Sequence, residues 1–138
     1  MGATKMKMGI TFGVFDLFHA GHCLMLREAR RNCDYLIACV QTDPTCREGK
    51  NVPIQSISER VIQLHACRYV DDVKVYNTED DVIRLLAHSH WDVRIIGEEY
   101  QNRNFTGRDL CEGKIYYNSR THNYSTTELR RRIQDAPI

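Results

Sequence analysis

Short apolar runs alternate with amphipathic segments along the whole chain. The runs have the length and composition of β-strands, and they lie at 8–14, 35–40, 72–75, 93–97 and 114–117. Between most of them, apolar residues recur at the three- and four-residue spacing of a helix with one buried side. This order predicts an α/β fold with a single-domain doubly wound parallel sheet that carries helices on both faces, the Rossmann-like class.

Polar residues with capping chemistry mark the predicted helix starts. Ser56 and Ser125 each precede a glutamate by three residues, which is the capping-box spacing. Thr78 is followed by acidic residues, which the positive end of a helix dipole favours. In the last helix we expect Leu129 and Ile133 to form the buried side.

The length and charge of the chain limit its organisation and its partners. Because 138 residues are typical of one domain, we expect 1–6 to be a flexible lead-in and 7–138 a single domain. With 19 Lys and Arg against 18 Asp and Glu, the net charge of +1 gives no argument for nucleic acid or an anionic membrane as a partner. No apolar run approaches the roughly 20 residues of a membrane span, and no secretory signal is evident.

The six cysteines show no CxxC pair, and several lie inside apolar segments. This pattern is typical of buried free thiols in a reducing compartment, so we expect a cytoplasmic protein without disulfides.

The first strand-to-helix loop contains the clearest candidates for functional residues. His19 and His22 are three residues apart at a predicted helix start, with Gly21 between them. Free backbone N–H groups and the helix dipole make such a start suitable for a phosphate, and two imidazoles can donate hydrogen bonds to its oxygens during an in-line displacement. The residues alone leave a metal-binding pair or ordinary structural histidines as alternatives.

Three motifs resemble those of one enzyme family. GVFDLFHAGH (13–22) resembles the HxGH signature of the cytidylyltransferase-like nucleotidyltransferases. RTHNYSTTELRRRI (120–133) is similar to their second signature, R-T-x-G-I-S-T-T, and 59–73 resembles the central motif of the small glycerol-3-phosphate cytidylyltransferases. The three motifs fall in the family's order and span nearly the whole chain.

The resemblance implies transfer of CMP from CTP to a phosphorylated small alcohol, first of all glycerol 3-phosphate, which gives CDP-glycerol and pyrophosphate. It implies Mg²⁺ bound with the triphosphate rather than by a protein ligand cluster, and a homodimer. His19 and His22 would stabilise the transition state at the α-phosphate, with Lys50 and Arg120 as the other catalytic candidates.

The resemblance also implies a nucleotide site that draws on all three motifs and on the loop after the fourth strand. Its candidate residues are Gly13, Val14, Phe15, Asp16, Gly21, Arg68, Gly97, Glu99, Arg120, Thr121, Ser125, Thr126 and Thr127. Lys50 and Arg47 are the candidates for binding the acceptor.

Plainer interpretations stay open beside these roles. Asp16 has the chemistry of a turn residue, Ser125 that of a simple N-cap, and Lys50 that of a solvated side chain. Arg68 and its neighbour Asp71 can be structural, and we expect the three arginines at 130–132 to form a solvated face.

Departures from the family pattern concern the substrates. Val14 replaces a common threonine, while Asn123 and Tyr124 replace the glycine and isoleucine of the second signature. The loop 97–100 reads Gly-Glu-Glu-Tyr instead of Gly-Asp-Asp-Trp, a difference that leaves the base selectivity open. A basic residue that faces the acceptor in relatives has no clear match, and Arg84 is only nearby.

Other functions remain in competition at this point. One is an adenylyltransferase acting on another phosphorylated metabolite, such as pantetheine phosphate or flavin mononucleotide. Another is a non-catalytic nucleotide-binding module of the same fold. An aminoacyl-tRNA synthetase shares a similar histidine pair, but the chain is too short and too balanced in charge for a tRNA-binding partner domain.

Overall fold

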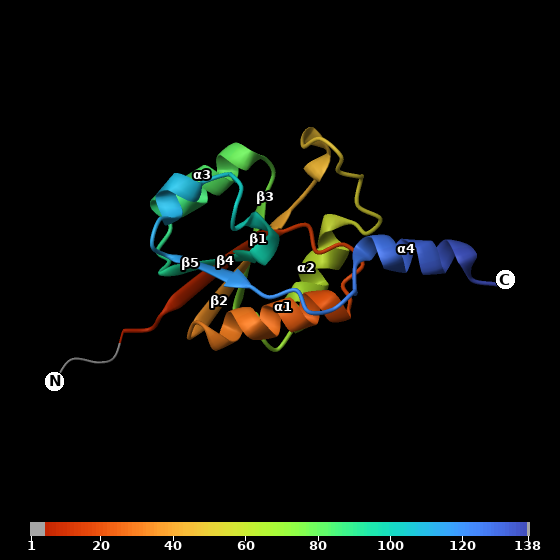
Figure 1. The fold of residues 1–138 in the computed structure, drawn as a ribbon, viewed down its shortest axis with the longest axis horizontal. Helices are drawn as coiled ribbons and strands as arrows, with labels where there is room; N and C mark the ends of the chain where they lie inside the picture. Colours follow the sequence, from red (N-terminus) through yellow and green to blue (C-terminus); the bar gives the residue numbers. More distant parts are fainter. Residues whose placement is uncertain (1–4, 138) are drawn as a thin grey trace.

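Five parallel strands form the centre of the described part of the chain, residues 5–137 of the computed structural model (Figure 1). The sheet order is β3-β2-β1-β4-β5. The strands are β1 (Met8–Gly13), β2 (Tyr35–Gln41), β3 (Asp72–Tyr76), β4 (Val93–Gly97) and β5 (Ile115–Asn118). The helices are α1 (Ala20–Arg31), α2 (Ile57–Ala66), α3 (Glu79–His88) and α4 (Thr126–Asp135). Most of the predicted lead-in, residues 1–4, lies outside the described residues.

Helices cover both faces of the sheet, which confirms the predicted fold class. On one face, α1 and α2 bury Leu26 and Leu64 against Leu36 of β2. On the other face, α3 packs Leu86 against Ile37 of the same strand. Because both faces are covered, β2 is an almost continuous apolar run, as expected for the interior of a parallel sheet.

The capping residues begin the helices where the sequence places them. Ser56 accepts a hydrogen bond from the Glu59 N–H, and Glu59 bonds back to the Ser56 N–H. Ser125 likewise accepts from the N–H of Glu128. The return bond from Glu128 does not form in this second case, because its carboxylate pairs with Arg131 instead.

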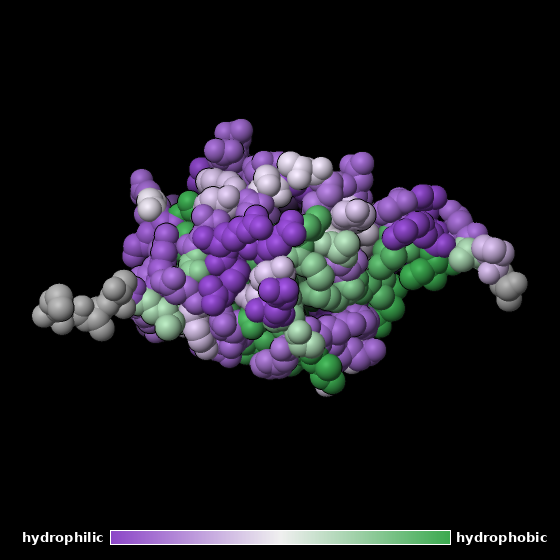
Figure 2. Space-filling view, turned by 90° about the horizontal axis from the view of Figure 1, so that it is seen from below, coloured by the Kyte–Doolittle hydropathy of each residue, from purple (hydrophilic) through white to green (hydrophobic). Residues whose placement is uncertain are grey.

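The last helix departs from the sequence-based expectation. Ile133 is 60% exposed, Leu129 is only half-buried, and α4 has no buried residue, so the predicted burial of this side is wrong for a single chain. Figure 1 shows the reason, because α4 projects from one end of the sheet instead of lying on a face. Hydrophobic side chains gather toward that end of the molecule in Figure 2.

All six cysteines are free thiols, as the sequence indicates. None of the helices within residues 5–137 has the length and apolar character that crossing a bilayer would require.

Candidate active site

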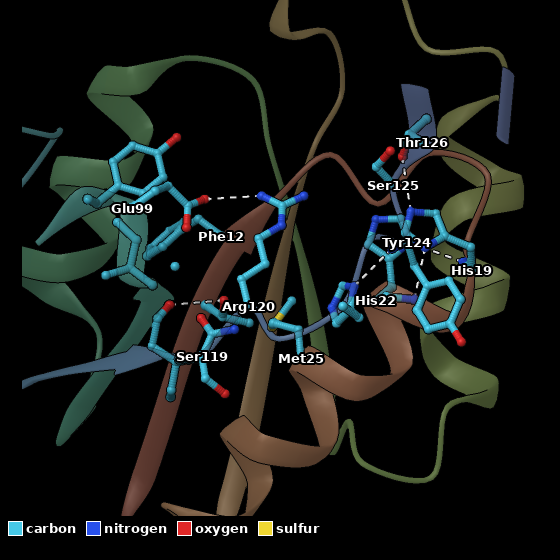
Figure 3. A pocket seen from close by; sticks show the side chains of 18 residues that line it. Phe12, His19, His22, Met25, Glu99, Ser119, Arg120, Tyr124, Ser125 and Thr126 are labelled. Atoms are coloured by element: carbon cyan, nitrogen blue, oxygen red, sulfur yellow. Dashed lines mark hydrogen bonds and ion pairs between the residues drawn. The ribbon is translucent and has the colours of Figure 1, made fainter. Parts of the chain in front are cut away.

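Two neighbouring cavities open at the carboxyl edge of the sheet, where the strand-to-helix loops meet. The histidine cavity, of about 260 Å³, is lined among others by His19, His22, Arg120, Ser125 and Thr126 (Figure 3). The second cavity, of about 310 Å³, is lined among others by Arg47, Lys50, Tyr76, Arg94 and Phe105. Phe12, Ile95, Ile96 and Tyr100 contribute to the walls of both.

The two candidate histidines are held by the backbone of the helix they begin. His19 is the N-cap of α1, and its Nδ1 accepts a hydrogen bond from the N–H of Gly21 at 3.0 Å. His22 Nδ1 accepts from the N–H of His19 at 3.1 Å. The pair therefore forms a capping box in which imidazoles replace the usual hydroxyl and carboxylate.

These bonds fix which ring nitrogen carries the proton. Because both Nδ1 atoms accept, both neutral rings carry hydrogen on Nε2, which is then the donor. His19 Nε2 lies 3.3 Å from the hydroxyl of Thr126 at the start of α4, a long contact that a phosphate oxygen can replace. Both rings line the histidine cavity, so the site presents two neutral donors side by side.

The surroundings keep both rings neutral at physiological pH. Burial, followed by the neighbouring His122 and Arg120, lowers the pKa of His19 below its ordinary value. Burial and His19 lower the pKa of His22 to about 3. A neutral donor suits a transition state whose charge develops on phosphate oxygens and whose nucleophile needs no deprotonation.

Gly21 is required where the histidine rings approach the backbone. A Cβ at this position would lie 2.8 Å from Cε1 of His19 and 3.0 Å from Cε1 of His122. Any side chain here would displace the rings that the cavity presents.

Arg120 brings positive charge to the other side of the histidine cavity. Its Nη1 lies 3.4 Å from Oε1 of Glu99, and its backbone N–H donates to Glu98 at 3.1 Å. In Figure 3 its guanidinium lies between Glu99 and the histidine pair. Arg120 can therefore reach a phosphate while Glu99, at the far end of the pocket, is available to the rest of a nucleotide.

Comparison with known proteins agrees with this geometry. A family model described as cytidylyltransferase-like matches residues 10–132. The chain belongs to this family.

Relatives and one solved structure give the same picture. The chain is 30% identical to the glycerol-3-phosphate cytidylyltransferase of Bacillus subtilis, over 93% of this chain and 98% of that protein. It is 50% identical to a probable ethanolamine-phosphate cytidylyltransferase of Encephalitozoon cuniculi, but over only 54% of this chain and 24% of that protein. A lipopolysaccharide core biosynthesis protein from Thermoplasma volcanium shares the fold, with a TM-score of 0.66, 24% identity, and coverage of 88% of this chain and 100% of that one. The predicted family and enzyme class, a cytidylyltransferase, are thus confirmed.

The histidine cavity gathers the core of the predicted site. Its lining includes these candidates: His19, Gly21, His22, Gly97, Glu99, Arg120, Ser125 and Thr126. Ser125 also caps α4, so its cap role and its place in the site coexist. Lys50, Arg47 and Gly13 line the second cavity instead.

Other candidates lie elsewhere. Arg68 is exposed against the ring of Tyr69, in the loop between α2 and β3. That loop is at the amino edge of the sheet, opposite the cavities, where Asp71 bonds to Arg30 and to the N–H of Leu36. Asp71 is therefore a structural residue. Thr121 and Thr127 are exposed and are not among the residues that line either cavity.

Asp16 connects the first strand-to-helix loop to the second loop and to α4, instead of forming a local turn. It is 5% exposed, and its carboxylate accepts from the N–H groups of Ile54 and Gln55, each at 2.9 Å. Arg130 of α4 completes the set at 3.1 Å, so the expected solvated face of three arginines is wrong for Arg130. Burial alone would raise the pKa of Asp16, but these donors outweigh it and hold the pKa below its ordinary value.

The loop before the histidines is strained, and a buried arginine holds it. Phe15 and Leu17 have positive φ angles of 54° and 50°, which are unfavourable for such residues. Arg60, 1% exposed, donates to the carbonyls of Val14, Gln41, Thr42 and Gln55. It thereby joins the first and second strand-to-helix loops. Val14 and Phe15 are not among the residues lining the histidine cavity.

Sequence reasoning missed Arg60 and His122. Arg60 lies on the apolar side of α2, three residues after Ile57 and four before Leu64, and a charge at that position signals a buried, fully bonded arginine. His122 lines the histidine cavity, and its Nδ1 accepts from the N–H of Tyr124 at 3.1 Å. Its place two residues after Arg120 was the available signal.

The neutral state of His22 predicts an acid-sensitive fold. The pKa of His22 is about 3 in the native state against an ordinary value of 6.5, so between pH 6.5 and 3 only the unfolded chain takes up a proton on this ring. The contribution of His22 to the free energy of unfolding is therefore fully present above pH 6.5 and falls as the pH drops toward 3. A His22→Gln variant keeps a cap acceptor without titrating, so between pH 7 and 5 it should lose less unfolding free energy than the parent, by on the order of 1–2 kcal/mol. Urea unfolding at several pH values measures this, with exposed His65→Gln as the control. Equal pH dependence of parent and His22→Gln would contradict it.

The four hydrogen bonds of Arg60 to backbone carbonyls predict that its replacement lowers the stability of the fold strongly. Arg60→Met leaves four carbonyls without this donor, so unfolding should cost about 2–4 kcal/mol less. Denaturant titration compares it with Arg84→Met, whose side chain is exposed on α3. A loss no greater than that of Arg84→Met would show that Arg60 does not hold the loops.

Proposed function

We propose that the protein transfers CMP from CTP to glycerol 3-phosphate, giving CDP-glycerol and pyrophosphate. The observation that carries this proposal is the pair of neutral imidazoles at the start of α1, fixed by backbone bonds so that their Nε2–H groups are the donors beside Arg120. The full-length similarity to the Bacillus subtilis enzyme supports the choice of both substrates.

The chemistry follows from these groups. A phosphate oxygen of the acceptor attacks the α-phosphorus of CTP, the bond to the oxygen that bridges to the β-phosphate breaks, and pyrophosphate leaves. His19 and His22 donate to the α-phosphate oxygens as negative charge develops, and Arg120 with the start of α4 receives the departing phosphates. The acceptor phosphate is already ionised near neutral pH, so no residue needs to act as a general base.

We propose that Mg²⁺ is bound with the triphosphate. The described residues include no group of three or more His, Cys, Asp or Glu side chains placed to hold a metal ion. Mg²⁺ commonly takes phosphate oxygens and water as most of its ligands, so the triphosphate can itself supply the main ligands of the ion. When bound, the ion neutralises charge on the triphosphate.

We also expect the protein to act in the cytoplasm.

A pyrophosphate-release panel tests the function directly. It crosses CTP, ATP, GTP and UTP with several phospho-alcohols in the presence and absence of Mg²⁺. The proposal predicts turnover with CTP and glycerol 3-phosphate that depends on Mg²⁺. Activity with ATP but not CTP would contradict the assignment of the base, and tight nucleotide binding without turnover would indicate a non-catalytic module.

The role of His19 predicts a specific kinetic effect. His19→Ala should lower kcat by about 100- to 1000-fold while changing the Kd of CTP little, because the lost hydrogen bond acts mainly in the transition state. Steady-state kinetics and equilibrium CTP binding separate the two. Equal losses in kcat and in affinity, or none, would contradict the role.

We further propose a homodimer in which α4 contributes to the contact. Ile133 is 60% exposed on α4, which projects from the body of one chain, and Tyr124, just before this helix, is 52% exposed. A second copy would cover these apolar side chains, and hydrophobic side chains gather toward the α4 end of the molecule in Figure 2.

Light scattering after size exclusion tests the dimer. The expected mass is twice the 16.1 kDa of one chain. Ile133→Asp should shift the mass toward that of one chain, whereas Ile83→Asp on α3, also at an exposed position, should not. A monomer at all concentrations, or equal behaviour of both variants, would contradict the proposed contact.

A further inference from the structure

The second cavity carries a positive charge that the proposed reaction does not yet use. Three basic side chains line it, namely Arg47, Lys50 and Arg94, together with the acidic side chains of Glu48 and Glu79. Glu79 lies 3.5 Å from Nε of Arg47, and Glu48 is exposed at the rim. The basic group at the buried end is Arg94, an arginine within the apolar strand β4.

Arg94 is buried without a counter-ion. It is 5% exposed, and its guanidinium lies 5.0 Å from the ring centre of Phe12 and 5.1 Å from that of Phe105. Its Nη1 donates to the Thr106 carbonyl at 2.6 Å, while its Nε is buried without a hydrogen-bond partner. No carboxylate within residues 5–137 lies within 4.0 Å of it.

Comparison with Arg60 shows what is unusual about this arrangement. Arg60 is equally buried, but four carbonyl oxygens surround its guanidinium and it is not among the residues that line either cavity. Arg94 has one carbonyl oxygen and a 3.8 Å contact from Nη1 to Sγ of Cys111, a weak acceptor, and it lines a cavity large enough for a small molecule. A buried charge with so few partners is unfavourable, so the contents of the cavity are the natural source of oxygen ligands.

The two-cavity arrangement tells which part of a substrate would meet Arg94. If the histidine cavity holds the triphosphate, the reacting phosphate of the acceptor must reach the α-phosphate there. The remainder of the acceptor, its tail, then extends over the shared wall of Phe12 and Tyr100 into the second cavity.

We propose that Arg94 determines the acceptor class by the charge of this tail, an inference that rests on the proposed function. Arg94 accepts a tail that bears hydroxyl or carboxylate oxygens, and it rejects a tail that ends in an ammonium group. Oxygen acceptors satisfy the guanidinium, whereas a buried like charge would be repelled. This separates the two acceptor chemistries named for the relatives above, glycerol phosphate and ethanolamine phosphate.

A purely structural role for Arg94 makes a different prediction. Its bond to Thr106 and its contact with Phe105 also fasten the loop after β4. If that were its whole contribution, its loss would lower activity with every acceptor by the same factor. A specificity role changes the ratio between acceptors.

The experiment measures kcat/KM with CTP and three acceptors, namely glycerol 3-phosphate, 3-phosphoglycerate and ethanolamine phosphate. The parent protein should use ethanolamine phosphate at least about tenfold less well than the other two. Arg94→Met should reduce this ratio about tenfold or more, and Arg94→Lys should largely keep it. Arg84→Met, an arginine with an exposed side chain on α3 outside the cavity, is the matched control and should leave the ratio unchanged.

Several outcomes would overturn the proposal. Equal use of ethanolamine phosphate and glycerol 3-phosphate by the parent protein does so without any variant, which covers the case in which Arg94→Met fails to fold. An unchanged ratio in a folded Arg94→Met protein, with turnover intact, refutes the role of Arg94 alone. No pyrophosphate release with any pair of substrates refutes the proposed function, and the inference with it.

Discussion

The site depends on a reciprocal pair of hydrogen bonds at the start of α1. Each imidazole uses Nδ1 to accept a backbone N–H that would otherwise be unpaired at a helix start. The same bonds orient the rings, select the neutral tautomer with hydrogen on Nε2, and leave Gly21 no room for a side chain. A common device for beginning a helix thus also presents two donors to the histidine cavity.

The rest of the carboxyl edge keeps this pair in place. The preceding loop contains two non-glycine residues at positive φ, a conformation that persists only when the surroundings enforce it. Arg60 binds its carbonyl at Val14, and Asp16 ties it to the second loop and to Arg130 of α4. Residues distant in the sequence therefore act together, and the strain is concentrated next to the proposed chemistry.

The features that could be predicted from the sequence are those that short stretches of the chain determine. Strand positions and capping residues are short-range signals, and the structure agrees with them. It also places the histidines of the motif at 19–22 at the start of α1. The partners of Asp16, the buried charge of Arg94 and the exposure of Ile133 depend on contacts between distant segments. Periodicity marks Ile133 as apolar but does not say whether the surface that covers it belongs to the same chain. Arg68 shows the converse, since its motif matches the family but the topology places it at the opposite edge.

The protonation of the two histidines tests the central claim most directly. Nitrogen-15 chemical shifts of the imidazole rings, assigned with His19→Gln and His22→Gln variants, report both charge and tautomer between pH 5 and 8. We predict that His22 stays neutral with its hydrogen on Nε2 across the whole range, and that His19 does so at neutral pH with a pKa below its ordinary value. A hydrogen on Nδ1, or a His22 ring that titrates near the ordinary value, would contradict the account.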